Sequence, residues 1–530
     1  MPRTHRRAIR AVALVAGAGV ALALVPGGAA TAAPAQKGCE NRTNATVQAL
    51  LACVNASGAV EHLEALQAIA DANGGTRAAG TQGYEDSVDY VVDTLEAAGW
   101  KVSIDEFPFT YVGPSTLQQL NPVNATYPTG PYTGSGAGDV TAAVTPVDLQ
   151  LGLGNTSTSG CEASDFAGFT AGTIALLQRG TCAFGVKAVN AEAAGAAGVI
   201  IFNQGNLATA DRQDLIVGTL GGSDVVDIPV VGASYAQGVA LAQAGSTAKI
   251  FVPAPEQRPQ KNVIAELPGA NDGNVVMAGA HLDSVQAGPG INDNGSGSAS
   301  LLEIAQNMSK NKPQNTVRLA WWGAEEAGLL GSRAYVDGLS QAEKDRIALY
   351  LNFDMVASPN YIFMVYDGDE SGFKAPVVVP DGSVAIEDLF ESYFTKAGQP
   401  YDDAEFSGRS DYQAFIQAGI PAGGLFTGAE VVKTQEQEDI WGGVAGESYD
   451  QCYHQACDTI DNVNVKALDV NIDAIALAVL AYSYSTQAVN GVGGAPVPGG
   501  LKLPAPAGPE ESWSSGGGGL AHDHGVEAGV

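Results

Sequence analysis

Apolar residues recur at helical spacing in two early segments of the chain and alternate with polar residues in the segment that follows. Residues 60–72, VEHLEALQAIADA, and 83–99, GYEDSVDYVVDTLEAAG, predict two amphipathic helices, the second ended by Gly99. Residues 101–107, KVSIDEF, alternate in the manner of a half-buried strand. The chain therefore opens with two helices and a strand.

A longer alternation of strands and helices begins at Asn262. Strand-like apolar runs occupy 262–267, 274–280, 316–323, 348–353, 361–366 and 420–426, and helical patterns occupy 298–309, 326–338, 384–397 and 467–487. This order predicts an α/β fold with an open mixed, mainly parallel sheet flanked by helices. Ligands of such sheets bind at the carboxyl ends of the strands, so functional residues are expected there.

The region between these two parts has a different composition. Residues 111–160 are rich in Gly, Pro, Thr and Asn, and residues 173–204 follow the order strand, turn, Ala-rich helix, strand. Over roughly 120–256 the chain resembles a protease-associated domain, through Cys161, IALLQRGTCAF, Lys187 and AAGAAGVIIFN. The resemblance implies an inserted β-rich domain, which we interpret as a lid or spacer rather than a dedicated ligand site.

Both ends of the chain differ from a globular domain. Residues 1–32 contain four arginines, an apolar run and an A-x-A-like site at Ala30 and Ala32, which predicts a signal peptide and a secreted, extracellular protein. No stretch has the ~20 apolar residues that a membrane-spanning helix needs. The Gly- and Pro-rich end predicts a disordered or processed tail. The predicted organisation is a signal peptide at 1–32, the first part of the main domain at 37–115, the insertion at 116–256, the main part at 257–490 and the tail at 491–530.

The formal net charge of -31 at pH 7 makes nucleic acid and anionic membranes poor partners. So acidic a surface favours cations, and calcium is compatible with it, although the sequence contains no EF-hand-like run of ligands. We expect a monomer.

Six cysteines in an exported chain indicate disulfides rather than a metal framework. They fall into three sequence-local pairs. The predicted bonds are therefore Cys39 with Cys53, Cys161 with Cys182 and Cys452 with Cys457.

Residues of metal-ligand type follow the predicted strands. They are His281, Asp283, Asp293, Glu325, Glu326, Asp354 and His454. Two adjacent glutamates alone indicate a solvated turn, but the whole set would converge at one edge of the sheet. Histidines with carboxylates suit zinc in open, hydrolytic coordination. Five ligands are too many for one four-coordinate zinc ion and suit two ions that share a carboxylate.

Longer motifs occur between residue 262 and about residue 460, and most of them contain one of these positions. They are AGAHLDSV, GINDNGSG, WWGAEEAGLLGS, LNFDMVASPN, GRSDYQAF, GGLFTGAE and CYHQACDTIDN. In them the chain resembles the secreted bacterial dizinc leucyl aminopeptidases, a family related to glutaminyl cyclases and transferrin-receptor ectodomains. The resemblance implies a zinc-exopeptidase fold and two zinc ions. His281 and Asp354 would bind one ion, Glu326 and His454 the other, and Asp293 would bridge them.

The same resemblance implies a reaction, the removal of large apolar, Leu-like residues from peptide and protein N-termini by metal-activated water. Glu325 would be the general base, the hydroxyl of Tyr453 would stabilise the oxyanion, and Asp283 would hold His281. The substrate amine would be held by Glu325 and Asp354, with the backbone at Arg409. Met355 and Phe426 would line the side-chain pocket, although Phe426 as a core residue and Arg409 as a surface ion-pair partner are equal alternatives.

Two other interpretations use the same fold. A carboxypeptidase or a glutaminyl cyclase is one, but the cyclases work with one zinc ion, and the full set of five ligands argues against them. A receptor-like protein without activity is the other, and it would be expected to have lost ligands that are all present here.

Overall fold

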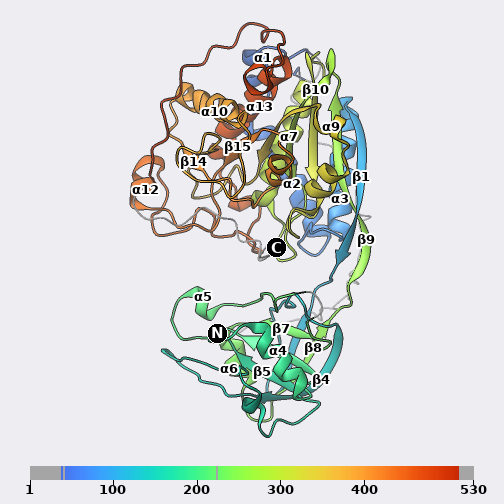
Figure 1. Ribbon diagram of the computed structural model, residues 1–530, viewed down its shortest axis with the longest axis vertical. Coiled ribbons are helices and arrows are strands. Elements are labelled where there is room, and N and C mark those ends of the chain that lie inside the picture. The colour runs from blue at the N-terminus through green and yellow to red at the C-terminus, as the bar shows by residue number, and fades with distance from the viewer. Residues whose placement is uncertain (1–37, 40–41, 223–224, 513–530) are drawn as a thin grey trace, which may run out of the picture.

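The computed structural model describes residues 38–39, 42–222 and 225–512. They form two lobes, each with its own sheet, joined by a long pair of strands (Figure 1). The expected signal peptide at 1–32 and the end of the expected tail at 513–530 lie outside the described residues. None of the described helices is long and apolar enough to cross a membrane.

The larger lobe is built on a mixed sheet. In the described part of the chain its eight strands lie in the order β1 (Lys101–Tyr111), β9 (Glu256–Leu267), β11 (Asn315–Trp322), β10 (Asn271–His281), β12 (Ile347–Phe353), β15 (Ala422–Phe426), β13 (Met364–Tyr366) and β14 (Asp402–Ala404). The four central strands, β11, β10, β12 and β15, are parallel, whereas β1, β9 and β11 pair antiparallel in succession. Every residue of β12 is buried, as expected of a parallel strand covered on both faces. The predicted α/β fold is confirmed.

Helices cover both faces of this sheet, as the two neighbouring tryptophans of β11 illustrate. Trp321 points to one face, where its Nε1 donates to the carbonyl oxygen of Ser298 (3.1 Å). Trp322 points to the other, where its ring packs against Tyr335 and Phe415 at centroid distances of 5.2 and 6.0 Å. The first face carries α2 (Ala56–Ala72), α3 (Gln82–Ala98), α7 (Ser296–Met308), α10 (Ser383–Ala397) and α13 (Val465–Tyr484), and the second carries α8 (Leu330–Gly338) and α11 (Tyr412–Gln417).

Short helices complete the larger lobe. They are α1 (Val47–Leu51), α9 (Gln341–Lys344), α12 (Gln435–Trp441) and α14 (Gln487–Asn490).

Local capping decides where the helices begin. The side chain of Asn55 accepts from the backbone N–H of Gly58 (3.2 Å), so α2 starts four residues before the predicted stretch. The predicted helix at 326–338 is wrong at its beginning, because α8 starts at Leu330. The carbonyl of Glu325 instead accepts from the N–H groups of Gly328 (2.8 Å) and Leu329 (2.7 Å), which closes a turn before the helix.

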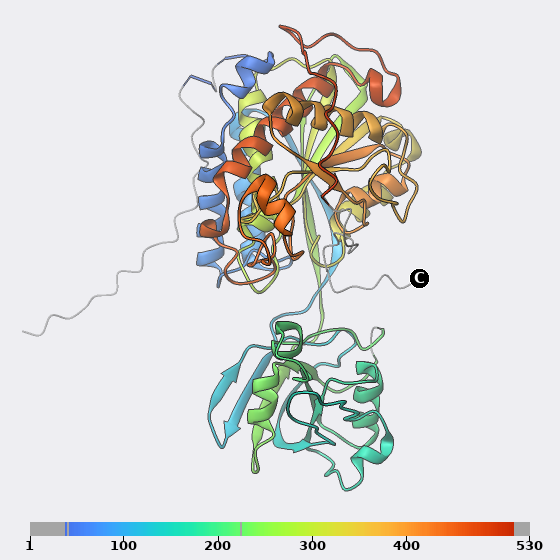
Figure 2. The same ribbon diagram turned by 90° about the vertical axis from the view of Figure 1, so that its left-hand side faces the viewer.

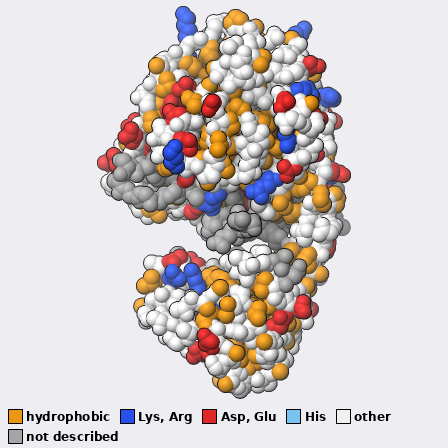
Figure 3. Space-filling view, in the orientation of Figure 1, with side chains coloured by type: hydrophobic (Ala, Val, Ile, Leu, Met, Phe, Trp, Pro, Cys, Tyr) orange, Lys and Arg blue, Asp and Glu red, His pale blue; other side chains and the backbone are white. Residues whose placement is uncertain are grey.

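The smaller lobe lies between β1 and β9 in sequence, within the predicted insertion. Its described sheet has the order β3 (Ala125–Tyr127), β2 (Thr116–Asn121), β8 (Thr247–Val252), β4 (Gly138–Pro146), β5 (Ile174–Gln178), β6 (Gly198–Phe202) and β7 (Val230–Ala233), and its helices are α4 (Phe184–Ala193), α5 (Ala210–Gln213) and α6 (Tyr235–Leu241). β1 and β9 pair over their full length and form the narrow connection between the lobes (Figure 2). The surface is hollowed between the lobes on the side away from this connection (Figure 3).

Three disulfides join the sequence-local cysteine pairs. They are Cys39 with Cys53, Cys161 with Cys182 and Cys452 with Cys457. The first joins the segments before and after α1 in the larger lobe, the second lies in the smaller lobe, and the third lies in the loop that carries His454.

Residues 491–512, the described part of the predicted tail, follow the surface of the larger lobe. The N–H of Glu510 donates to the carbonyl of Tyr401 (2.9 Å), and Val497 is buried. Both the N–H (3.1 Å) and the hydroxyl of Ser512 donate to the carboxylate of Asp402. The expected disorder is therefore wrong for this part. A Gly- and Pro-rich segment cannot form a core, but its backbone donors can bind a folded surface.

Candidate metal centre

Five side chains of metal-ligand type meet at the carboxyl edge of the central strands. His281 ends β10, Asp354 directly follows β12, and Glu326 lies in the turn after β11. The other two come from loops: Asp293 lies in the turn Ile291–Gly295 before α7, and His454 in the loop closed by the disulfide of Cys452 and Cys457. Converging strand ends and two loops thus bring all five predicted ligands together.

Asp293 stands between the two histidines. Its Oδ1 is 3.2 Å from Nε2 of His281, and its Oδ2 is 3.2 Å from Nε2 of His454. Nε2 of His281 is also 3.3 Å from Oδ1 of Asp354, and Nε2 of His454 is 2.9 Å from Oε2 of Glu326. One carboxylate therefore offers one oxygen to each of two neighbouring pairs of a histidine and a carboxylate.

The hydrogen bonds of His281 direct its second nitrogen into this cluster. Nδ1 donates to the carbonyl oxygen of Asp283 (3.0 Å), which places the proton of a neutral imidazole on Nδ1. The lone pair of Nε2 then faces oxygens of Asp293 and Asp354. Three such electron-rich atoms repel one another unless a cation lies among them. Because imidazole and carboxylate are ligands of zinc, the residues fit a zinc centre.

The cluster shifts the ionisation of its members. Burial and the Glu326 carboxylate act to raise the pKa of Asp293, but the neighbouring imidazoles of His281 and His454 outweigh them and lower it to about 2. Burial lowers the pKa of His454, but Glu326 and Asp293 raise it to about 11. Burial, with a contribution from Asp354, raises the pKa of Glu325 well above its usual value. The central carboxylate thus stays ionised at neutral pH, as a metal ligand must.

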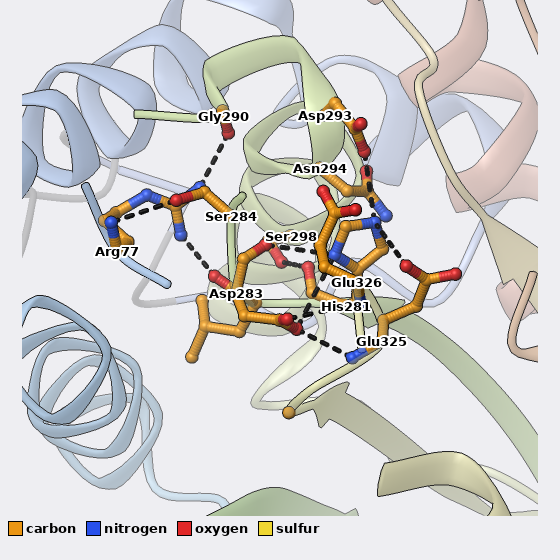
Figure 4. Close-up of polar contacts among 12 residues, drawn as sticks. Arg77, His281, Asp283, Ser284, Gly290, Asp293, Asn294, Ser298, Glu325 and Glu326 are labelled. Carbon is orange, nitrogen blue, oxygen red and sulfur yellow. Dashed lines mark hydrogen bonds and ion pairs between the residues drawn. The ribbon is translucent and has the colours of Figure 1, made fainter. Parts of the chain in front are cut away.

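The adjacent residues Glu325 and Glu326 are held by one buried carboxylate. Oδ1 of Asp283 accepts from the N–H of Glu325 (3.1 Å), and its Oδ2 accepts from the N–H of Glu326 (3.3 Å) (Figure 4). The two side chains then diverge. Glu326 reaches His454, whereas Oε2 of Glu325 lies 3.9 Å from Nε2 of His281.

A series of buried hydrogen bonds holds the carboxylate of Asp354 in place. The hydroxyl of Ser410 donates to Oδ2 of Asp354 (2.6 Å), and Nδ2 of Asn352 donates to that hydroxyl (2.8 Å). Asn352 accepts in turn from the hydroxyl of Tyr350 (3.1 Å). These bonds occupy Oδ2, so Oδ1 is the oxygen that faces His281.

Asp458 fixes the turn that carries Asp293. Its two carboxylate oxygens accept from the N–H groups of Asn292 (2.9 Å) and Asp293 (3.0 Å). The peptide bond between Asp293 and Asn294 is cis.

The loop of Tyr453 and His454 is tightly shaped. Their rings stack at a centroid distance of 3.8 Å, and Tyr453 is buried. His454 has a φ of 57°, and Ala324 and Met355, each next to a residue of the cluster, have φ of 56° and 51°. Non-glycine residues in this left-handed region are uncommon and concentrate at functional sites.

The predicted substrate-contacting residues occupy different environments. Met355 is fully buried, and its carbonyl accepts from the N–H of Thr427 (3.0 Å), next to Phe426 at the end of β15. Arg409 is half-buried, and its Nη1 lies 3.8 Å from Oε1 of Glu430. The structure therefore brings Met355 and Phe426 into neighbouring segments and places Arg409 in an ion pair.

Comparison with known proteins supplies the family. The model of peptidase family M28 matches residues 262–479, and that of the PA domain matches residues 140–241. An aminopeptidase of Pseudomonas aeruginosa is 53% identical over 447 residues, which are 83% of this chain and 83% of that protein. The chain belongs to peptidase family M28. The predicted family and its protease-associated domain are confirmed.

Other members of M28 support this assignment. Leucine aminopeptidase 2 of Trichophyton rubrum is 41% identical over 433 residues, 80% of this chain and 83% of that protein. The solved structure of a zinc aminopeptidase from Bacillus subtilis matches with a TM-score of 0.62 and 27% identity, over 80% of this chain and 94% of that chain. The M28 family thus confirms that the chain is a peptidase and implies zinc for the centre.

Sequence reasoning missed several residues that support the M28 centre. Ser410 lies in the motif GRSDYQAF and Asp458 in CYHQACDTIDN, but the residue type alone predicts no role for either. Arg77, which binds the loop between His281 and Asp293, lies about 200 residues before it in sequence. Its acceptors are backbone carbonyl groups, and these leave no residue type to recognise.

Proposed function

We propose that this M28 peptidase is a secreted aminopeptidase with two zinc ions that removes large apolar N-terminal residues. The observation that carries this proposal is the position of Asp293, with one oxygen 3.2 Å from Nε2 of each histidine. A shared carboxylate is the feature expected of a two-metal hydrolytic centre. The names of the relatives, aminopeptidase and leucine aminopeptidase 2, favour the N-terminal end of the substrate.

In this proposal His281 and Asp354 would hold one zinc ion, Glu326 and His454 would hold the other, and Asp293 would offer one oxygen to each. When bound, zinc polarises a carbonyl group and makes water a nucleophile near neutral pH. The hydrogen bond from Ser410 orients Asp354, and the bond to the Asp283 carbonyl orients His281.

Glu325 is the proposed proton carrier. Asp283 holds its backbone while its carboxylate points to the His281 side of the cluster. It would take a proton from the attacking water and deliver it to the departing amine. The hydroxyl of Tyr453, next to His454, would donate to the oxyanion that forms.

Residues next to the proposed zinc ligands would bind the substrate. Glu325 and Asp354 would hold the free α-amine of the substrate, together with the backbone at Arg409. Met355 and Phe426, in adjacent segments at the ends of β12 and β15, would define an apolar pocket. Turnover of leucine, methionine and phenylalanine anilides would rank the preference.

The decisive experiment measures zinc content together with turnover of leucine anilide and of its N-acetylated form. About two zinc ions per chain, with cleavage of the free amine only, support the proposal. Cleavage at the C-terminus of a blocked peptide contradicts it. Glu325→Gln should retain zinc and lose turnover by at least about 100-fold, whereas Glu303→Gln, at a buried glutamate of α7 outside the centre, should keep both.

We also propose export as a monomer. The basic and apolar pattern of residues 1–32 and the three disulfides support export. Sequencing the N-terminus and C-terminus of protein from the culture medium would test removal of the signal peptide and processing of the tail. Sedimentation would give the oligomeric state.

Calcium is the second metal that we propose. Ligand atoms of Glu387, Glu391 and Asp403 lie within 4.8 Å of one another, and all three residues are buried. Oδ1 of Asp403 is buried and accepts no hydrogen bond within the described residues. Clustered carboxylate oxygens suit calcium. Calorimetric titration of calcium into zinc-loaded protein should show binding that Asp403→Asn removes, and equal binding by both proteins contradicts the site.

A further inference from the structure

Arg77 is a fully buried arginine in the segment between α2 and α3. Its guanidinium donates to three backbone carbonyl oxygens: from Nη1 to Leu282, from Nε to Pro289 (2.9 Å) and from Nη2 to Gly290 (2.6 Å). None of the ion pairs in the described part of the chain includes it. A buried charge held by carbonyl groups alone is costly unless its geometry is well satisfied, so this arrangement requires an explanation.

The three acceptors bracket the loop that joins two ligands of the proposed centre. Leu282 directly follows His281, and Pro289 and Gly290 come shortly before Asp293. The guanidinium of Arg77 therefore binds both ends of this loop, the residue after His281 and the residues before Asp293 (Figure 4).

Ser284 fastens the middle of the same loop. Its hydroxyl accepts from the N–H of Arg77 (2.9 Å) and donates to the carbonyl of Gly288 (2.9 Å). The hydroxyl of Thr76 adds a bond to the carbonyl of Val285 (2.9 Å). The loop is thus bound to the segment of Arg77 along its length.

The charge of Arg77 also matters, because the surroundings are acidic. The carboxylates of Asp283, Asp458 and Asp293 all interact favourably with it. A positive charge beneath the centre offsets part of the repulsion among the carboxylates that converge there.

We propose that Arg77 is a positioning residue of the metal centre. Its guanidinium sets the distance between His281 and Asp293 and thereby the affinity for the zinc pair. The inference rests on the two-zinc centre proposed above. It also assigns a role to the segment before the inserted domain, which supplies no proposed ligand but holds the loop between two of them.

Two substitutions separate the shape of the side chain from its charge. Arg77→Lys keeps the charge, but an ammonium group cannot reproduce the planar fork that meets three carbonyl groups. Arg77→Met removes both. Ser284→Ala removes the hydroxyl, and with it the bonds to the Arg77 N–H and the Gly288 carbonyl, but leaves the guanidinium of Arg77 in place. Arg318→Lys is the matched control, because Arg318 on β11 is a largely buried arginine that pairs with Glu266 outside the centre.

The test measures zinc affinity by competition with a chromophoric chelator, alongside thermal unfolding with and without zinc. We expect Arg77→Lys to bind zinc at least about tenfold more weakly, Arg77→Met more weakly still, and Ser284→Ala severalfold more weakly. The rise in melting temperature on adding zinc should shrink in the same order. Arg318→Lys should lower the melting temperature without zinc but leave zinc affinity within about twofold of wild type.

The outcomes distinguish this inference from the proposal on which it rests. Wild-type protein that fails to bind two zinc ions would overturn both. A two-zinc wild type with unchanged affinity in folded Arg77→Lys, or an equal loss in Arg318→Lys, would overturn the role of Arg77 alone. If Arg77→Met does not fold, Arg77→Lys and Ser284→Ala decide the question.

Discussion

Replacing Tyr350 with phenylalanine should weaken the metal centre through three successive hydrogen bonds. The hydroxyl of Tyr350 accepts from Nε1 of Trp322 (2.8 Å) and donates to Asn352, and the chain continues through Ser410 to Asp354. An indole nitrogen can only donate and a carboxylate can only accept, so every bond in this chain has one possible direction. Loss of one hydroxyl therefore affects each later member.

The structure limits the size of the effect. Phenylalanine keeps the ring that stacks on Phe415 at 3.8 Å and 4°, so packing should not change. Nε1 of Trp322 would lose its acceptor in the core, and Oδ1 of Asn352 would lose the hydroxyl that donates to it. An unsatisfied buried donor costs about 1 to 3 kcal/mol, and we expect the free energy of unfolding to fall by this amount. A less firmly oriented Asp354 should weaken zinc binding by about threefold to tenfold.

Urea unfolding and chelator competition would measure the two effects separately. Tyr482→Phe is the control, because the buried hydroxyl of Tyr482 donates to the carbonyl of Ala385 (2.8 Å) and takes no part in the chain. It should lower stability by about 1 kcal/mol and leave zinc affinity unchanged. The reasoning is refuted if Tyr350→Phe changes neither quantity, or if Tyr482→Phe weakens zinc binding equally.

Three further predictions concern other parts of the larger lobe. In Asp283→Asn an NH₂ group replaces one of the two carboxylate oxygens that accept from the N–H groups of Glu325 and Glu326. We expect kcat to fall at least about tenfold while KM changes less. Steady-state kinetics would measure both, and an unchanged kcat would contradict the prediction. Replacing Cys452 and Cys457 by serine should lower the free energy of unfolding by about 2 kcal/mol, the loop entropy of so short a disulfide, and calorimetry would measure it. Burial and neighbouring acids raise the pKa of Glu387 to about 9, of Asp403 to about 8 and of Glu391 to about 7. The folded protein therefore keeps protons on these three carboxyl groups that the unfolded chain releases above a pH of about 4. In calcium-free buffer, stability should therefore fall as the pH rises from about 5 to about 9, and saturating calcium should flatten this slope; an unchanged slope would argue against the cation site.

The fold and the cluster could be predicted because both depend on regular geometry. Parallel strands end at one edge of a sheet, so the residue types after 274–280, 316–323 and 348–353 were enough to bring His281, Glu326 and Asp354 together. The beginning of α8 could not be predicted, because it depends on a turn at Glu325 and a left-handed Leu329 rather than on apolar spacing. The packing of Ser512 and the role of Arg77 were also missed, since contacts with a distant backbone or side chain leave no periodic pattern in the sequence.

The positions of the adjacent residues Glu325 and Glu326 are set by hydrogen bonds to Asp283. Two neighbouring carboxylates in a turn would ordinarily repel and face water. Here both backbone N–H groups are bound to one carboxylate, which fixes the turn so that Glu326 reaches His454 while Glu325 stays on the side of His281. The carbonyl of the same Asp283 accepts from His281. One buried residue therefore orients a proposed ligand of each zinc ion and the proposed base at once. Asp283 thus fixes the proposed base relative to the proposed ligands, and this is why its replacement should change kcat more than substrate binding.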